Sequence, residues 1–443
     1  MLSVLANRTY RHLLAAQVVA LVGTGLATVA LGLLAYDLAG GNAGAVLGTA
    51  LAIKMIAYVG VAPVVGAFAD RLPRRAFLVA MDLIRAAVAL LLPFVDQIWQ
   101  VYVLIFVLQS ASAAFTPTFQ ATIPDVLPDE KDYTNALSLS RLAYDLENLL
   151  SPMLAAALLT VISFHWLFSG TSIGFVASAL LVITATLPRA AGAAAPRTGG
   201  IYARTTRGIR IYLATPRLRG LLAVTLAAAA GSAMVIVNTV VIVRGQLGLS
   251  SSDVAWALAA YGGGSILAAI ALPRILERTS DRRVMTIAAM TLAVLLGAMA
   301  VFTAKPPAVG YWPVLLVGWL LTGIAYSCAV TPGGRLLRRS AEATDRPALF
   351  AAQFALSHVC WLVAYPLAGW LGASAGMAAA FAATGVLALI GAGTAILIWP
   401  SVDPTVMPHR HDDLPADHPH RAEHGNDHAH AYVIGDLHLR WPR

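Results

Sequence analysis

The chain has 443 residues, of which 58% are hydrophobic and only 12% are charged, and its mean hydropathy is +0.74. A soluble domain is roughly half apolar and about one quarter charged, so this composition excludes an ordinary soluble enzyme. The two cysteines, Cys328 and Cys360, exclude a disulfide scaffold, and the net charge of +8 does not indicate a nucleic-acid partner because the charges lie in short loops between apolar runs.

Twelve apolar runs are long enough to cross a bilayer, which takes about 20 residues. We expect helices and not a β-barrel, because lipid cannot satisfy open sheet edges and the runs do not alternate. In chain order the runs cover approximately residues 13–36, 45–69, 76–95, 99–121, 136–162, 166–187, 220–243, 254–276, 284–304, 311–332, 348–372 and 375–399. The predicted fold class is an all-α polytopic membrane protein with twelve transmembrane helices.

The positive charges predict the orientation of these helices. Nearly all Lys and Arg fall in the N-terminus, in the connections that follow even-numbered helices and in the C-terminal tail, whereas the opposite side carries only Arg244 and Lys305. Positively charged loops stay in the cytoplasm. We therefore expect a multi-pass protein of the inner membrane with both termini in the cytoplasm. No cleaved signal peptide is recognisable, because the first run is too long for one.

The longest connection divides the chain into two halves. We expect an N-terminal six-helix half at 1–187, an Arg-rich cytoplasmic linker at 188–219, a C-terminal six-helix half at 220–400 and a tail at 401–443. Transporters are commonly built from two such halves. The linker arginines also suit an anchor on anionic lipid.

An internal repeat supports the division. The second helix is followed by a G-x-x-x-D-R-x-x-R-R stretch from Gly66 to Arg75, and the eighth is followed by a Glu277-Arg278 pair and then Asp281-Arg282-Arg283. An acid, an arginine and a basic pair thus recur at matching positions in the two halves.

These features resemble the major facilitator superfamily. The resemblance covers about residues 1–400 and implies a conformational latch that governs alternating access without binding substrate. The latch residues would be Gly66, Asp70, Arg71, Arg74, Arg75, Glu277 and Arg278. Pro73 replaces the glycine usual in that loop, and Ser151 precedes Pro152 where exporters of the family have glycine.

A stretch from Ala114 to Asp125 resembles the macrolide and siderophore exporter branch of the superfamily. This stretch, together with a tail from Ser401 onward that carries eight of the eleven histidines, is most similar to the bacterial nickel-resistance efflux proteins of that branch.

The tail is rich in histidine and interleaved with carboxylates. Its histidines are His409, His411, His418, His420, His424, His428, His430 and His438. Neutral imidazole binds Ni, Co, Cu and Zn, so the tail is predicted to bind a divalent metal, with a solvating or pH-sensitive tail as the alternative. Its prolines and scarcity of apolar residues predict disorder.

A few polar residues lie within the apolar runs, where placing them in the membrane costs free energy and therefore indicates a role. Glu147 has no cation nearby in sequence and His358 lies midway along the eleventh helix, so these two are the leading candidates for proton or metal transfer; Lys54 could instead pair with an acid across the bundle. The further candidates for this pathway are Asp145, Asn148, Asn238 and Gln109. The alternatives are an Arg141–Asp145 ion pair and a hydrogen-bonded core histidine.

The sequence contains no P-loop, H-E-x-x-H or G-x-S-x-G motif, so we expect a transporter driven by an ion gradient and not an enzyme. The leading hypothesis is efflux of a divalent metal, Ni²⁺ or else Co²⁺, by proton antiport, with no cofactor. The alternatives are export of a drug, siderophore or other organic molecule, whose cavity Trp256, Tyr261, Tyr326 and Trp361 would line, and a metal sensor that does not transport.

Metal binding by the tail can be tested directly. The purified protein should bind Ni²⁺ in calorimetric titration at about pH 7.5 and much more weakly at about pH 5.5, because protonated imidazole cannot ligate a metal. Removal of residues 405–443 should abolish this binding. Equal binding at both pH values, or by the truncated protein, would contradict a histidine site.

Overall fold

The structure is a computed structural model of the chain. The structure describes residues 2–68, 73–129, 132, 135–136, 139–140, 143, 147, 151, 153–185, 201–304, 310–342, 345–403, 406–410, 427–435, 438 and 441. The latch residues Asp70 and Arg71 and the pathway candidates Asp145 and Asn148 lie outside the described residues, as does Arg141.

The N-terminal half is a bundle of long helices. Its elements are η1 (Leu2–Ala6), α1 (Arg8–Ala39), η2 (Gly40–Asn42), α2 (Ala43–Phe68), α3 (Arg74–Leu91), η4 (Leu92–Phe94), α4 (Ile98–Val126) and α6 (His165–Thr184). The described residues between 132 and 158 are helical and form the helix-five segment. Asn7 caps α1 by accepting a hydrogen bond from the Tyr10 amide at 3.0 Å.

The C-terminal half repeats the pattern. Its elements are α8 (Pro216–Val240), which continues into the π-helical turn η5 (Val241–Gln246), then α9 (Ser251–Arg278), α10 (Asp281–Thr303), α11 (Tyr311–Val330), α12 (Gly333–Arg339), α13 (Arg346–Ser374) and α14 (Met377–Ile398). Ser250 and Asp253 form a reciprocal capping box at the start of α9. The expected all-α polytopic fold is confirmed.

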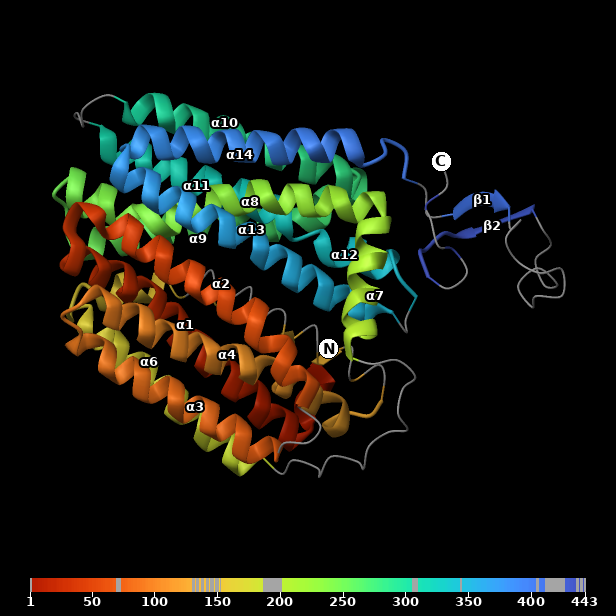
Figure 1. Ribbon diagram of the computed structural model, residues 1–443, viewed down its shortest axis with the longest axis horizontal. Coiled ribbons are helices and arrows are strands. Elements are labelled where there is room, and N and C mark those ends of the chain that lie inside the picture. Colours follow the sequence, from red (N-terminus) through yellow and green to blue (C-terminus); the bar gives the residue numbers. More distant parts are fainter. Residues whose placement is uncertain are drawn as a thin grey trace.

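The two halves lie side by side and meet along few helices (Figure 1). Among the described residues, α2 packs along α13, while α1 and α2 also touch α8. Both chain termini lie at one end of the bundle, here called the tail end; the opposite end, with η2 and η5, is called the far end (Figure 1).

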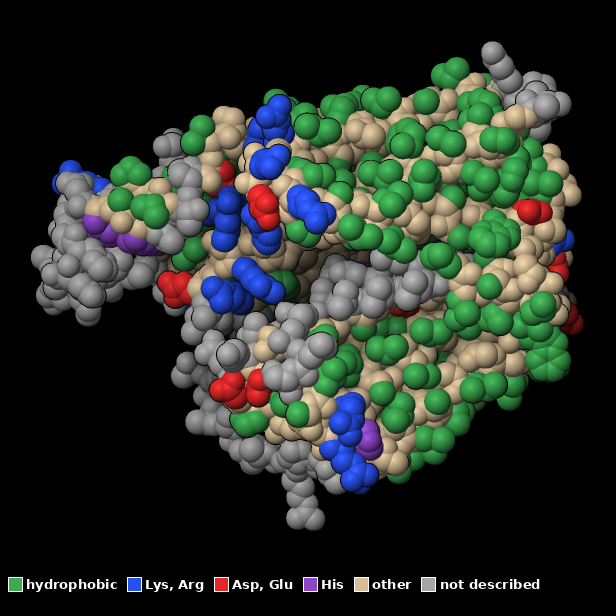
Figure 2. All heavy atoms as spheres, turned by 180° about the vertical axis from the view of Figure 1, so that it is seen from behind, with side chains coloured by type: hydrophobic (Ala, Val, Ile, Leu, Met, Phe, Trp, Pro, Cys, Tyr) green, Lys and Arg blue, Asp and Glu red, His purple; other side chains and the backbone are tan. Residues whose placement is uncertain are grey.

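The side chains on the outside suit a bilayer. Figure 2 shows hydrophobic side chains over the flank of the bundle and Lys and Arg gathered near the tail end. Ten stretches in the described part of the chain are long and apolar enough to cross a membrane, the first of them containing both α1 and α2. Trp99, Trp166 and Trp370 are more than half exposed near far-end helix termini, where aromatic residues favour the membrane interface.

The linker contains a helix that docks on the C-terminal half. Helix α7 (Ile201–Ala214) packs against α13. Arg207 donates two hydrogen bonds to the Asp345 carboxylate, from Nε at 2.7 Å and from Nη2 at 2.9 Å. Tyr212 donates a hydrogen bond to Gln353 Oε1 at 2.5 Å.

The expectation of a disordered tail is wrong for its described segments. Strands β1 (Val406–Arg410) and β2 (Asp427–Ala431) pair antiparallel, and the chain that follows packs on the C-terminal half. The buried anchor is Arg217 at the start of α8, which is 2% exposed: it pairs with Asp403 at 3.3 Å, donates to the Tyr432 carbonyl at 3.3 Å and lies over the Trp441 ring at 4.8 Å. A few aromatic residues thus supply the packing that the average composition of the tail conceals.

A buried ion pair holds the N-terminal half together. Asp82 and Arg85 of α3 pair with each other, and Ser178 of α6 donates to Asp82 at 2.8 Å. The Arg85 guanidinium lies between the rings of Phe115 and Phe175, at 4.3 and 4.5 Å from their centroids. These partners give the pair a structural role within one half.

Docking of the tail through Trp441 predicts that loss of this residue reduces the protection of the tail amides against hydrogen exchange. Trp441→Ala should remove the stack on Arg217 and speed hydrogen exchange of the amides at 427–434 by about fivefold, since a cation–π contact is worth about 1 kcal/mol. Mass spectrometry of the intact protein measures this exchange. Val402→Ala, an exposed change in the same tail, is the control; equal exchange in all three proteins would contradict docking through Trp441.

Candidate functional site

The centre of the interface carries a group of polar and aromatic side chains on α2 and α13. The ring of His358 stacks on that of Tyr58 at 5.2 Å and 11°, and Phe354 lies 4.0 Å from the same imidazole. His358 Nδ1 is 2.6 Å from the Phe354 carbonyl oxygen, which can only accept. The neutral imidazole therefore holds its proton on Nδ1 and presents the Nε2 lone pair.

Two opposite charges accompany this aromatic group. Lys54 Nζ lies 6.0 Å from the Tyr58 ring centroid, one turn away on α2. The charges of Lys54 and Glu147 act on each other, and Lys54 also acts on His358. Glu147 comes from the helix-five segment, and its Oε1 lies 3.3 Å from the position of a Cβ at Gly25 of α1. The interface thus joins an acid, a base and an ammonium group from three helices.

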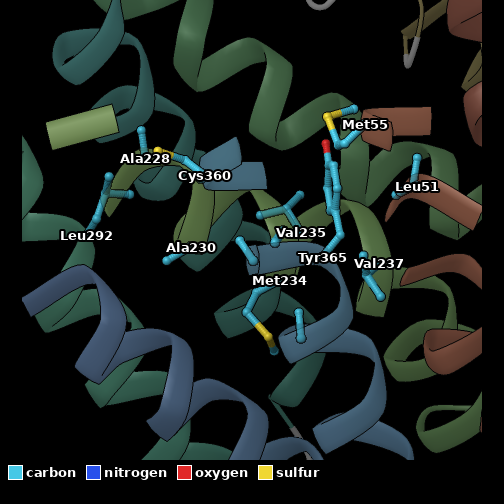
Figure 3. Packing of buried hydrophobic residues seen from close by; sticks show 14 of the residues in the cluster. Leu51, Met55, Ala228, Ala230, Met234, Val235, Val237, Leu292, Cys360 and Tyr365 are labelled. Carbon is cyan, nitrogen blue, oxygen red and sulfur yellow. The ribbon is translucent and has the colours of Figure 1, made fainter. Parts of the chain in front are cut away.

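A cluster of tyrosines adjoins this group on the side of the C-terminal half. Tyr261 of α9 and Tyr326 of α11 have ring centroids 5.7 Å apart. Tyr365 of α13 is buried, and Figure 3 shows its hydroxyl pointing toward Met55, the neighbour of Lys54. These aromatic faces and hydroxyl groups can hold an organic molecule with apolar surface and a few polar groups.

Asn238 belongs to a different place. Its Nδ2 donates to the Ala368 carbonyl at 3.0 Å and contacts Met234 Sδ at 3.4 Å. Ala368 is ten residues beyond His358 on the same helix, which is about 15 Å. Asn238, a candidate for the same pathway as His358, therefore does not lie beside it, because the two residues are at different depths of the bundle.

One of the aromatic residues expected to line a cavity lies elsewhere. Trp256 is 50% exposed on the outside, not in the cavity wall proposed for it, whereas Trp361 packs against the core. Cys360 is buried in the core, away from the stacked ring of His358.

Polar residues form a stripe along α1 and another along α4, and their hydroxyl groups donate hydrogen bonds to the backbone of their own helix. Thr24 and Thr28 donate to carbonyls one turn earlier at 3.0 Å each, and Ser112 does the same to Leu108. Such bonds leave the hydroxyls with little need of an ion or a water. Gln109 is buried in the same stripe of α4.

The latch arginines that are described make contacts within the N-terminal half. Arg74 pairs with Asp125 at the end of α4, and Arg75 donates to the Ala185 carbonyl at the end of α6 at 2.6 Å. The latch residue Gly66 lies in the last turns of α2.

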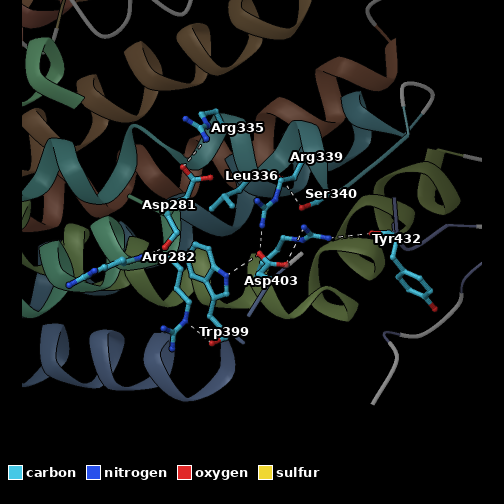
Figure 4. Close-up of polar contacts among 12 residues, drawn as sticks. Asp281, Arg282, Arg335, Leu336, Arg339, Ser340, Trp399, Asp403 and Tyr432 are labelled. Carbon is cyan, nitrogen blue, oxygen red and sulfur yellow. Dashed lines mark hydrogen bonds and ion pairs between the residues drawn. The ribbon is translucent and has the colours of Figure 1, made fainter. Parts of the chain in front are cut away.

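The second half repeats these contacts with the charges exchanged. Asp281 pairs with Arg335 at 3.5 Å, and Arg282 donates to the Trp399 carbonyl at 2.9 Å (Figure 4). The latch candidates Glu277 and Arg278 are exposed at the end of α9. Sequence reasoning missed Asp125 and Arg335, although both stand where the fourth and tenth helices end, beside the repeated loops.

Only part of the tail's histidine set is described. The strand register sets His409 opposite His428. The rings of His428 and His430 stack at 5.0 Å, and His430 lies 5.2 Å from His438. His438 Nδ1 is 3.1 Å from the Val433 carbonyl oxygen. Within the described residues, no three His, Cys, Asp or Glu side chains are arranged to hold a metal ion. The remaining tail histidines, His411, His418, His420 and His424, lie outside the described residues.

Two helical halves with polar groups buried between them define a membrane transporter. The model of the Major Facilitator Superfamily matches residues 13–242 and 221–422, so the chain belongs to this family.

Curated relatives match only part of the chain. Macrolide efflux protein A of Enterococcus faecalis is 25% identical over 153 residues, which are 32% of this chain and 47% of the relative. The uncharacterized MFS-type transporter YfiS of Bacillus subtilis is 28% identical over 127 residues, which are 29% of this chain and 30% of the relative. The chain spans less than half the length of these relatives.

Solved structures share the fold. A bacterial homologue of the human lysosomal transporter Spinster, in an inward-facing and unoccupied conformation, has a TM-score of 0.68 at 13% identity, covering 88% of this chain and 97% of that one. The nucleoside transporter NupG has a TM-score of 0.66 at 14% identity, covering 89% and 100%. At such identity these matches show the fold alone.

The charges at the interface predict an energetic coupling. Lys54→Met and Glu147→Gln should each lower the Tm in detergent, since each leaves the other charge inside the bundle without the opposite charge that acts on it. The Tm of the double variant should lie well above the value expected from adding the two single losses. Glu342→Gln, at an exposed acid, is the control. Strictly additive losses would show that the two charges are independent.

Proposed function

We propose that the chain is a secondary transporter that exports a small organic molecule, with the interface between the halves as its binding site. The observation that carries this proposal is the aromatic lining of that interface: Tyr58 of the N-terminal half against Phe354 and His358 of the C-terminal half, and the cluster of Tyr261, Tyr326 and Tyr365 in the C-terminal half. Aromatic faces contribute large apolar contacts, and phenol hydroxyls orient a ligand. The macrolide efflux relatives support an organic cargo.

The charged groups supply the coupling in this proposal. Glu147 and His358 Nε2 can each take up a proton, and Lys54 acts on both. A cargo that displaces the proton on one side of the membrane and is displaced by it on the other would move against the proton. We place the tail end, which carries both termini and most of the basic residues, in the cytoplasm of a cell bounded by this inner membrane.

A second candidate cargo is a divalent metal, Ni²⁺ or Co²⁺. The observation that favours it is the row of imidazoles on the tail, whose hairpin register aligns His409 with His428. With this second cargo, the tail would bind ions near the cytoplasmic opening of the transporter and raise their local concentration. The aromatic lining of the interface favours the organic cargo.

Accumulation measurements distinguish the two candidates. Cells that express the protein should hold several-fold less of a radiolabelled macrolide or an aromatic dye than control cells, with ⁶³Ni unchanged. Tyr326→Ala should abolish the difference, because it removes one face of the tyrosine cluster. Trp256→Ala, an aromatic change on the outer surface of the same half, should leave it intact.

Lower ⁶³Ni with unchanged dye and macrolide would overturn the organic cargo in favour of metal export. Equal effects of the Tyr326 and Trp256 variants would place the binding site away from the tyrosine cluster.

A further inference from the structure

At the far end the backbones of α2 and α13 touch at glycines, and Trp370 Nε1 of α13 donates a hydrogen bond to Thr49 Oγ1 of α2 at 3.0 Å beside them. A Cβ on Gly48 of α2 would lie 2.6 Å from the Tyr365 carbonyl oxygen of α13, and a Cβ on Gly369 would collide with the Gly44 carbonyl oxygen. The helices therefore approach with their backbones in contact, which only glycine permits. We call Gly44, Gly48, Gly369 and Gly372 the glycine seam.

A buried amide from a third helix is wedged into this seam. Asn238 of α8 is fully buried, and its Oδ1 has no hydrogen-bond donor among the described residues. This oxygen occupies the space where a Cβ would project from Gly44 and from Gly372, at 2.6 and 2.9 Å from those positions. It thus faces the Cα hydrogens of one glycine from each half, and such contacts are much weaker than an N–H donor.

The Asn238 oxygen therefore lacks a hydrogen-bond donor only while the seam is closed. A buried acceptor without a donor is destabilising, whereas an acceptor that reaches water is not. Opening of the far end would remove Gly44 from Oδ1, and the Nδ2 bond to Ala368 would persist because both residues belong to the C-terminal half. Asn238 consequently weakens the closed arrangement relative to the open one.

A second contact covers the far end of the seam. Arg244, on the π-helical turn η5, lies over the ring of Tyr36 of α1 at 5.2 Å and donates to Ser251 Oγ at 2.5 Å. Gly245 lies so close that its Cβ would be 3.3 Å from the Tyr36 ring. Arg244 thus links the two halves by a cation–π contact at a turn type that is frequent at functional sites.

We propose that the glycine seam, the Arg244–Tyr36 contact and Asn238 form a balanced far-end switch. The seam and the Arg244–Tyr36 contact stabilise the closed far end, and the unsatisfied Asn238 oxygen limits how stable the closed state becomes relative to the open one. The switch sets the conformational equilibrium whatever the cargo is. It predicts that removal of the closing contacts and removal of the amide shift the equilibrium in opposite directions.

Spin labels across the far end can measure this equilibrium in the full-length protein in lipid nanodiscs. Labels at Asp96→Cys and Ala375→Cys, both exposed, report on the N-terminal and C-terminal halves after Cys328→Ser and Cys360→Ala remove the native thiols. Tyr36→Leu should raise the ratio of long to short distances several-fold, and Tyr36→Phe should not, because the ring is kept. Gly48→Ala should raise the ratio on the order of tenfold through overpacking, and Gly60→Ala, in open space on the same helix, should not.

Asn238→Leu provides the opposite test. Added to Tyr36→Leu, it should return the ratio of long to short distances toward that of the starting protein, because an apolar side chain of similar size removes the unsatisfied oxygen. Thermal unfolding of each variant establishes that it is folded; if Gly48→Ala is not, the Tyr36 and Asn238 variants carry the test. The proposal is overturned if folded variants share one distance distribution, or if Asn238→Leu increases the long distance.

Discussion

Close contact between α2 and α13 is the interaction on which the rest of the structure depends. The two six-helix halves touch along few helices, and this pair brings Lys54 and Tyr58 against Phe354 and His358. Glycine makes the contact possible at the far end, because any Cβ on Gly369 would collide with the facing backbone. Since the seam and the candidate site lie on the same two helices, a movement that opens one must change the other. In the proposed transporter, binding and conformational change would thus be coupled by geometry.

The buried charges fall into two classes that sequence alone does not separate. Asp82 and Arg85 are satisfied within one half by each other, by Ser178 and by two phenylalanine rings, so they stabilise that half as a rigid body. Lys54 and Glu147 come from different helices of the N-terminal half, and Lys54 also acts on His358 of the other half. A charge held by partners in one rigid body has no means to respond to transport, whereas a charge beside the moving boundary does.

The tail end shows the duplication of the halves at the level of single contacts. Arg75 and Arg282 each donate to carbonyls at the end of the last helix of their half, which satisfies groups that a helix terminus leaves without partners. The neighbouring ion pairs have exchanged signs, Arg74 with Asp125 and Asp281 with Arg335. Asp403 adds the tail to the second of these networks by pairing with Arg217 and Arg339. The tail is thereby part of the C-terminal half, in contact with the network beside the repeated loop.

The sequence by itself determined that the chain is a helical membrane protein of two halves, because run length, backbone hydrogen bonding and the placement of basic residues are local properties that lipid constrains strongly. It also singled out Glu147 and His358, because polar groups are rare in apolar runs. Tertiary structure decided which polar groups lie near one another: Asn238 and His358, both in apolar runs, lie at different depths, and Lys54 acts on the charge of Glu147 from another helix. It also decided that the tail forms a hairpin on Arg217, since a few aromatic contacts outweigh an average composition typical of disorder. Such pairings depend on helix rotation and depth, which packing sets and which no local pattern encodes.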